Sequence, residues 1–393
     1  MVLALLGVFL LLLGGVAILT GTLPLTDLAA LADRVAPILL FVVAMTIVTE
    51  LCSDAGVFRF IARRLRRWGL GSAWWLWLLV CILAVLTTIF LSLDTTAVLL
   101  TPIVVNVARQ AGLPPLPFAL ITVWLANTAS LLLPISNLTN LLAQQQLGSI
   151  TPLGFATLMA APAVVAILVP MAVVAVVYRG QLTTRYPRTP TVPAGGARPP
   201  LPPDRVLGGV SAGILLALIP ALLSGLPVWI PASAAAAALI LVYAVRRRTA
   251  LRWGLVPWSL LTFVSGLFVA MAALENLGLP AILASLAGTG GSPAELLRLG
   301  ATGMLGANVA NNLPAYLALE PIADTTPRLL SLLVGVNAGP LITPWASLAT
   351  LLWHDRLRSM NVQVNWRAFI VFGLGLAPLT VGLSLGALIL VTP

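Results

Sequence analysis

Amide and hydroxyl side chains gather in two stretches that are otherwise strongly apolar. Residues 127–142 read NTASLLLPISNLTNLL, and residues 337–352 read NAGPLITPWASLATLL. Pro134 and Pro344 remove a backbone N–H inside each stretch, so a helix should break there and leave backbone groups in need of partners. Amides and hydroxyls can both donate and accept hydrogen bonds, which suits a small polyhydroxy solute. The candidate binding residues here are Asn127, Thr128, Ser130, Ser136, Asn137, Asn337, Gly339, Thr343 and Ser347.

The two stretches also form an internal repeat. At a constant offset of 210 positions, six of sixteen residues are identical, and an Asn and a Pro stand seven apart in both copies. Leucine matches are common in so apolar a chain, whereas a matching Asn and Pro inside a span are not. Small polar residues also mediate helix packing in membranes, so a structural role is the alternative for either stretch alone. Two related stretches, each with an internal proline, favour a binding site.

Polar residues mark two further junctions, where the second of two apolar segments is too short to cross a membrane comfortably. Such a junction is tolerated at membrane depth only if it is buried in protein or lines a cavity. Each pair of segments is therefore predicted to form a re-entrant hairpin, over residues 73–108 and 293–323. The candidate binding residues at the tips are Asp94, Thr95 and Thr96 in the first hairpin and Asn308, Asn311 and Asn312 in the second.

Asp94 is the most informative charge in the chain. An ionisable side chain inside a membrane is costly and indicates a function, so we expect Asp94 to contact the solute and to carry the coupling ion. Asp94 also begins the second arm of its hairpin, where a carboxylate can cap a helix, and this structural role stays open. Glu50, Asp54 and Glu275 lie near segment ends and are expected to be interfacial or structural.

The composition explains why these polar residues stand out. Hydrophobic residues make up 60% of the 393 residues and charged residues only 8%, with a mean hydropathy of +1.07. A soluble domain usually carries about 25% charge, so most of this surface must face lipid. The composition predicts an all-α polytopic membrane protein with about nine full spans besides the hairpins. The predicted spans are 3–20, 36–58, 116–145, 151–178, 206–224, 228–245, 255–283, 327–353 and 367–391.

Arginine residues set the predicted orientation. The net charge is +10, and all 21 basic residues are Arg, clustered in short loops between apolar spans rather than on a surface that could bind nucleic acid. Placing the cluster at 59–67 in the cytoplasm puts every Arg there except Arg34, Arg298 and Arg328. Residues 3–20 lack a basic leader and a cleavage site, so they are predicted to be a retained first span. We expect a bacterial cytoplasmic membrane protein with its N-terminus in and its C-terminus out.

The chain is predicted to divide into two inverted repeats. Residues 179–205, rich in Pro, Gly and Arg, are expected to be a flexible cytoplasmic linker. Residues 1–178 form the first predicted repeat, with hairpin 73–108 and broken helix 116–145. Residues 206–393 form the second, with hairpin 293–323 and broken helix 327–353. Inverted repeats with broken helices at mid-membrane are typical of secondary transporters.

Five sequence runs resemble the motifs of one family, the arsenical pump membrane proteins of the ion-transporter superfamily. They are DTTAVLLTPIV (94–104), NTASLLLPISNLTN (127–140), ANNLP (310–314), GPLITPWASLATLLW (339–353) and NVQVNW (361–366). The resemblance covers most of the chain from about residue 36. It implies two inverted repeats, each with a re-entrant hairpin and a broken helix, and export of arsenite or antimonite. The sequence departs from the pattern in starting one span short. It also has Asn127 and Asn337 where familiar members carry Asp, and Leu341 in place of a Lys.

Chemistry separates the functions that remain open. Arsenous acid is mostly uncharged at neutral pH, so its hydroxyls suit Asn, Thr and Ser. Cys52 and Cys81 alone cannot form a three-thiolate site, and no metal or other cofactor is expected. The first hypothesis is therefore proton-coupled export of arsenite or antimonite, and the alternative is a sodium/proton antiporter or an anion or carboxylate permease. An enzyme is not expected, since the only His lies at a helix end. Without Lys there is no phosphate-binding loop, although a soluble ATPase subunit or a second copy in a homodimer could be a partner.

Overall fold

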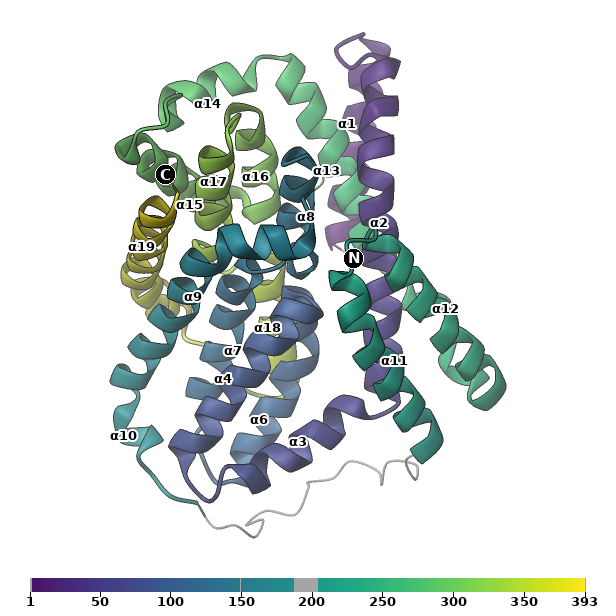
Figure 1. The fold of residues 1–393 in the computed structure, drawn as a ribbon, viewed down its shortest axis with the longest axis vertical. Helices are drawn as coiled ribbons and strands as arrows, with labels where there is room; N and C mark the ends of the chain where they lie inside the picture. Colours follow the sequence, from purple (N-terminus) through teal and green to yellow (C-terminus); the bar gives the residue numbers. More distant parts are fainter. Residues whose placement is uncertain (1, 149, 187–203, 393) are drawn as a thin grey trace.

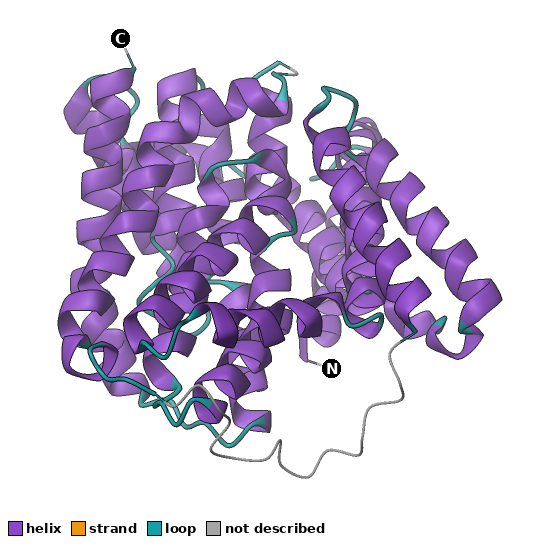
Figure 2. Ribbon diagram, turned by 60° about the horizontal axis from the view of Figure 1, so that its bottom comes forward, coloured by secondary structure: helices purple, strands orange, loops and turns teal. Residues whose placement is uncertain are grey.

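The computed structural model describes residues 2–148, 150–186 and 204–392, and the named elements in this part of the chain are all helices joined by loops and turns (Figure 2). Seven of the described helices are long and apolar enough to cross a membrane. At 1.5 Å per residue, their 18 to 30 residues span about 27 Å or more. They are α2 (Leu25–Asp54), α4 (Ala73–Phe90), α9 (Pro152–Val177), α11 (Arg205–Leu223), α12 (Trp229–Arg246), α13 (Trp258–Asn276) and α19 (Trp366–Val391).

The helices form two groups, which Figure 1 shows side by side. The peripheral bundle contains α1 (Val2–Leu19), α2, α11, α12 and α13, with α1 packed along α13 and α2 along α12. Small residues allow the closest of these contacts, because a Cβ on Gly266 would lie 2.5 Å from the backbone oxygen of Gly7. The central bundle contains the remaining long helices together with both hairpins and both broken helices.

Two short helices connect the bundles at opposite ends of the molecule (Figure 1). α3 (Val57–Trp68) joins α2 to α4, and α14 (Leu279–Ala287) joins α13 to the second hairpin. Each begins after a glycine in the left-handed region, Gly56 at φ 84° and Gly278 at φ 89°, where a side chain would be strained. The predicted single spans 36–58 and 255–283 were therefore wrong at these glycines, which an apolar run does not reveal.

Both predicted hairpins reverse direction at their polar tips. The first consists of α4, α5 (Leu93–Thr95), the π-helix η1 (Thr96–Leu100) and α6 (Thr101–Gln110). The second consists of α15 (Pro293–Ala310), α16 (Asn312–Leu319) and η6 (Glu320–Ile322). The reversals occur at Ser92, with φ 141°, and at Asn311, with φ 123°. Non-glycine residues rarely adopt such angles, so each tip holds a locally strained backbone.

Both predicted helix breaks are confirmed. The first interruption lies between α7 (Leu116–Thr128) and α8 (Leu138–Gln146), where the short turns η2 (Ala129–Leu131) and η3 (Pro134–Ser136) replace regular helix. The second lies between α17 (Thr326–Ala338) and α18 (Leu348–Ser359), where residues 339–347 are not helical. Each second half begins after an extended residue, Asn137 or Ser347, whose side chain accepts a hydrogen bond from the backbone N–H two or three residues later.

The predicted linker 179–205 begins with defined structure. Residues 179–182 form the short helix α10 (Arg179–Leu182). The next residues pair with the turn before α4, because Ala73 N donates to Thr184 O at 3.1 Å and Tyr186 N donates to Gly71 O at 2.9 Å. A fully flexible linker was therefore the wrong expectation for residues 179–186. Residues 187–203 lie outside the described part of the chain.

Candidate functional site

Asn337 joins the two broken helices inside the central bundle. Its side-chain oxygen accepts hydrogen bonds from Asn137 Nδ2 at 3.0 Å and from Thr139 Oγ1 at 2.8 Å. Its Nδ2 donates to Asn140 Oδ1 at 2.8 Å. Asn337 is only 1% exposed, and its three partners are buried as well. The two breaks therefore meet, as the internal repeat suggested, and they meet through amides that satisfy one another.

Other polar residues of the first break satisfy its freed backbone. Asn140 Nδ2 donates to the carbonyl oxygens of Ser130 at 2.6 Å and Leu133 at 3.0 Å. The Ser136 hydroxyl contacts the same two carbonyls, and Ser130 Oγ donates to Asn127 O at 2.6 Å. Asn127 Nδ2 donates to its own helix, at Val123 O, 2.9 Å away. These side chains act mainly as substitutes for the hydrogen bonds of a continuous helix.

The second hairpin tip is fastened to the second break. Asn308 Oδ1 accepts from the backbone N–H groups of Ile342 and Thr343, both at 3.1 Å, and its Nδ2 donates to Gly339 O at 2.8 Å. Thr343 Oγ1 returns a hydrogen bond to Asn308 O at 2.8 Å. At Gly339 a Cβ would lie 2.8 Å from the side chain of Met304, which explains the glycine.

Asn311 and Asn312 extend this fastening. Asn311 Nδ2 donates to Trp345 O at 2.8 Å, and Asn312 N donates to Ala346 O at 2.9 Å. The predicted residues Asn308, Asn311 and Thr343 therefore form one hydrogen-bonded seam with the backbone of residues 339–346. The tip and the break form one structural unit in this half of the bundle.

The first hairpin tip is held mainly by its own hydroxyls. Thr88 Oγ1 donates to Thr96 Oγ1 at 2.9 Å, and Thr96 Oγ1 lies 3.0 Å from Thr87 Oγ1. Ser92 Oγ accepts from Thr95 N at 3.2 Å and so caps the second arm. Asp94 is not the cap, and its Oδ1 is buried with no hydrogen-bond partner among the described residues. The alternative that Asp94 serves only as a helix cap is therefore wrong.

A cavity of about 610 Å³ lies where the hairpin tips face α2 and α13 of the peripheral bundle. Its wall is mostly apolar, as is usual for small-molecule sites, with a few polar groups that can fix a solute. Among the described residues that line it, none is Arg or His. The predicted site residues on its wall are Asp94, Thr95, Ser136, Asn137, Asn311 and Asn312.

The other predicted residues lie outside the cavity lining, in the hydrogen-bonded layers behind it or at a helix cap. They are Thr96, Asn127, Thr128, Ser130, Asn308, Asn337, Gly339, Thr343 and Ser347. Two of them retain a buried side-chain oxygen with no partner in the described part of the chain, Asn127 Oδ1 and Thr128 Oγ1. The structure thus divides the predicted site residues into six that line the cavity and nine that lie outside its lining.

α2 contributes polar wall residues that were not predicted as site residues. Thr46, Thr49 and Glu50 line the cavity, and Glu50 was expected to be interfacial or structural. The available signal was their spacing of three and four residues, which places them along one stripe of an apolar helix. Ser92 at the first hairpin tip and Ser259 on α13 are further polar wall residues that were not predicted.

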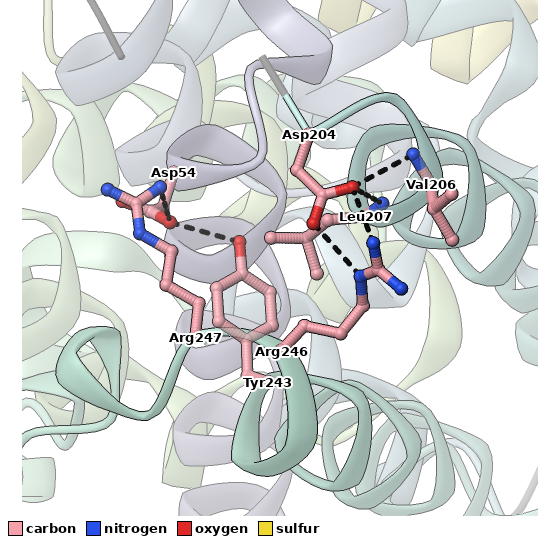
Figure 3. A network of polar contacts seen from close by, with 7 residues as sticks. All are labelled: Asp54, Asp204, Val206, Leu207, Tyr243, Arg246 and Arg247. Atoms are coloured by element: carbon pink, nitrogen blue, oxygen red, sulfur yellow. Dashed lines mark hydrogen bonds and ion pairs between the residues drawn. The ribbon is translucent and has the colours of Figure 1, made fainter. Parts of the chain in front are cut away.

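Charged residues near the end of α2 are paired with one another (Figure 3). Asp54 accepts from Arg247 at 2.9 Å and from the Tyr243 hydroxyl at 3.2 Å. Asp204 accepts from Arg246 at 2.9 and 3.1 Å. The Arg246 hydrogen bond, together with the backbone N–H of Leu207, holds the pKa of Asp204 below its ordinary value. Asp54 therefore has the structural role expected of it.

A second, polar cavity of about 510 Å³ lies at the other end of α2. Arg34 pairs there with Glu320, which also accepts from the Tyr316 hydroxyl at 2.9 Å. Glu275 lines this cavity rather than the larger one. Among the described residues, no group of three His, Cys, Asp or Glu side chains could hold a metal ion.

Comparison with known proteins identifies the family. A family model described as citrate transporter (CitMHS) matches residues 1–350. An arsenical pump membrane protein of Escherichia coli strain K12 is 30% identical over 360 residues, which cover 84% of this chain and 81% of the relative. Another arsenical pump membrane protein of Escherichia coli is 27% identical over 399 residues, which cover 95% of this chain and 91% of the relative. The arsenical pump membrane protein of Yersinia enterocolitica is 28% identical over 358 residues, which cover 84% of this chain and 81% of the relative.

These matches span most of the chain and confirm the resemblance seen in the sequence motifs. They also class the chain with transporters rather than enzymes. The chain is a multi-pass membrane transporter that belongs to the citrate transporter (CitMHS) family of the ion-transporter superfamily, together with the arsenical pump membrane proteins.

Proposed function

We propose that this chain exports arsenite or antimonite across the bacterial cytoplasmic membrane by proton antiport, with Asp94 as the proton carrier. The solute would bind in the 610 Å³ cavity between the bundles. The orientation with the N-terminus in and the C-terminus out, and the two inverted repeats, are part of this proposal. The matching angles at Ser92 and Asn311 and the paired helix breaks support the repeats.

The observation that carries the proposal is the chemistry of the cavity wall. Its described polar groups are carboxylates, amides and hydroxyls, with no basic side chain among them. Arsenous acid presents three hydroxyl groups and no charge near neutral pH, so amides and hydroxyls can bind it without a counter-charge. Asp94 lines this cavity, and its buried Oδ1 has no hydrogen-bond partner among the described residues, which suits a proton-binding group.

A carboxylate permease or a cation antiporter is the second candidate. The description of the matching family names citrate, and the carboxylates on the wall could serve a cation. A citrate anion entering this cavity would meet the carboxylates of Glu50 and Asp94 rather than an Arg, which disfavours free citrate. Like-charge groups in a site of low dielectric repel strongly.

Transport into inverted membrane vesicles separates the candidates. Cells that lack their own arsenite exporters would express the chain, and the vesicles would be energised to acidify their interior. We expect uptake of arsenite that collapses with the proton gradient, and no uptake of citrate. Citrate uptake, or sodium flux without arsenite uptake, would replace the proposed substrate. Vesicles from cells with an empty vector give the baseline.

A soluble ATPase subunit and a homodimer are the proposed protein partners. Arsenite uptake driven by a proton gradient without added ATP would show that the chain works without the ATPase. A stimulation by ATP that requires the soluble subunit would show that the two proteins act together.

A further inference from the structure

Glu50 shares the large cavity with Asp94, but it comes from the other bundle. Asp94 lies at the first hairpin tip, whereas Glu50 lies on α2. The cavity lies between these two groups of helices, so its two described carboxylates come from different bundles. Glu50 is also four residues from Asp54, the last residue of α2, about 6 Å along the helix axis. It therefore lies on the side of the cavity toward the arginine-rich end formed by α3 and the end of α12.

Glu50 has no hydrogen bond or ion pair with any described residue. The neighbouring hydroxyls on its stripe are occupied within their own helix. Thr46 Oγ1 donates to Val42 O at 2.7 Å, and Thr49 Oγ1 donates to Met45 O at 2.5 Å. A carboxylate in an apolar helix normally has a partner when its role is structural. Glu50 lines a cavity and has no such partner in the described part of the chain.

The described charged groups around α2 do not form an ion pair with Glu50. Asp54 is paired with Arg247 and Tyr243, and Arg246 is paired with Asp204. Arg59 on α3 donates to the Asp54 carbonyl oxygen at 3.4 Å. The other described ionisable groups on or beside the elements packed against α2 are Arg64 and Arg67 on α3, Arg205 on α11, Arg248 and Arg252 after α12, and Glu275 at the far end of α13. None of these forms an ion pair with Glu50.

We propose that Glu50 is a second proton-binding carboxylate of this transporter, which passes the coupling proton between Asp94 and the arginine-rich end. The inference rests on the proposed proton antiport. A protonated Asp94 gives its proton, directly or through water in the cavity, to the Glu50 carboxylate. Asp94 becomes a carboxylate and Glu50 a carboxylic acid. Glu50 then releases the proton to water at the end of α2 and returns to its starting state.

The two carboxylates then have different duties. Asp94, beside Thr95 and the amides of the second tip, meets both solute and proton. Glu50, beside two hydroxyls that are already satisfied, handles the proton alone. Removal of the Glu50 carboxylate should therefore slow proton-coupled transport and spare steps in which no proton moves.

The test uses the full chain in proteoliposomes with two assays. One assay measures arsenite uptake driven by a pH gradient, with proton flux followed by an internal pH dye. The other measures exchange of labelled for unlabelled arsenite at equal pH on both sides. We expect Glu50→Gln to lower the driven uptake about tenfold or more while exchange stays within about twofold of wild type. Glu50→Asp should recover part of the driven uptake, because it restores a carboxylate.

Glu275→Gln is the matched control, since Glu275 is exposed and does not line the large cavity. It should behave as wild type in both assays. Wild-type driven uptake by Glu50→Gln, in liposomes where the wild type is active, would overturn the inference alone. Loss of exchange together with driven uptake would also overturn it, because Glu50 would then serve solute binding or folding. A wild type that neither takes up nor exchanges arsenite would overturn the proposed function and this inference with it.

Discussion

The two hairpin tips share one backbone conformation but differ in what their side chains contact. Both reverse the chain at a non-glycine residue with positive φ, Ser92 or Asn311, and both cap the following arm with that residue's side chain. The second tip is then fastened to residues 339–346 through Asn308 and Asn311. The first tip forms hydrogen bonds within its own hairpin, and Asp94 Oδ1 has no hydrogen-bond partner among the described residues. The second tip stabilises the second helix break, whereas the first tip places the Asp94 carboxylate on the cavity wall.

Replacing Asp94 should give the largest functional effect and almost no loss of stability. Asp94→Asn keeps the shape of the side chain and removes the proton-binding group, so we expect proton-driven arsenite uptake to fall about 100-fold or more. Its Oδ1 makes no hydrogen bond with described residues, so the free energy of unfolding should change by less than about 1 kcal/mol. Vesicle uptake and thermal unfolding in detergent measure the two quantities. Wild-type uptake would exclude Asp94 as the carrier.

Replacing Asn308, in contrast to Asp94, should lower the stability of the protein substantially. Asn308→Ala removes the acceptor for two backbone N–H groups and the donors for two carbonyl oxygens, all at a residue that is 6% exposed. Leaving such groups unpaired should lower the free energy of unfolding by about 2–4 kcal/mol. Asn106→Ala is the matched control, because Asn106 is exposed on α6. Equal unfolding curves for the two variants would contradict a structural role for the second tip.

Substitutions at the two reversals should have smaller and graded effects. Ser92→Ala and Asn311→Ala each lose a cap while they keep a strained backbone, which should cost about 1–2 kcal/mol of stability. Asn311→Ala should cost more, since Asn311 also donates to Trp345 O. The glycine variants should cost less than alanine at both positions, because glycine adopts these angles without strain. Alanine variants as stable as their glycine counterparts would show that neither tip is strained.

The smallest effect is expected away from both tips, at Asp204. Its pKa is held below the model-compound value of 3.8 by Arg246 and the backbone N–H of Leu207, so its ionised form is favoured in the folded state. The stability that this contributes is fully present above about pH 5 and is lost as pH falls through the lowered pKa. Asp204→Asn should therefore unfold slightly more easily at pH 7 and converge with wild type as the pH falls through the lowered pKa of Asp204. A constant difference at all pH values would exclude the ion pair as the cause.

The sequence predicted the breaks and the tips because their causes are local. A proline lacks an N–H and disfavours regular helix, so Pro134 and Pro344 predicted the interruptions that follow α7 and α17. The short second arms and their polar junctions indicated reversals close to Ser92 and Asn311. The ends of α2 and α13 near Gly56 and Gly278 were not predicted, because a single glycine in an apolar run is compatible with a continuous helix.

Which polar residues line the cavity and which bond to the broken backbone depends on tertiary packing, so it could not be predicted from local sequence. Asn137 and Asn140 have the same chemistry and lie three residues apart, yet Asn137 lines the cavity and Asn140 satisfies the broken backbone. Glu50 was expected to be interfacial or structural, and its place on the cavity wall depends on a hairpin tip that lies far away in sequence. Sequence spacing identifies the polar stripe on α2, and only the arrangement of the two bundles shows what faces it.

A competition binding experiment is the most direct test of the claim that the cavity binds a neutral polyhydroxy solute. Purified protein would be dialysed against arsenite at neutral pH, and bound arsenic would be measured with citrate or antimonite added as competitor. The account predicts that arsenite binds at about one site per chain, that antimonite displaces it, and that citrate at equal concentration does not. Displacement by citrate, or no bound arsenite at all, would contradict the account.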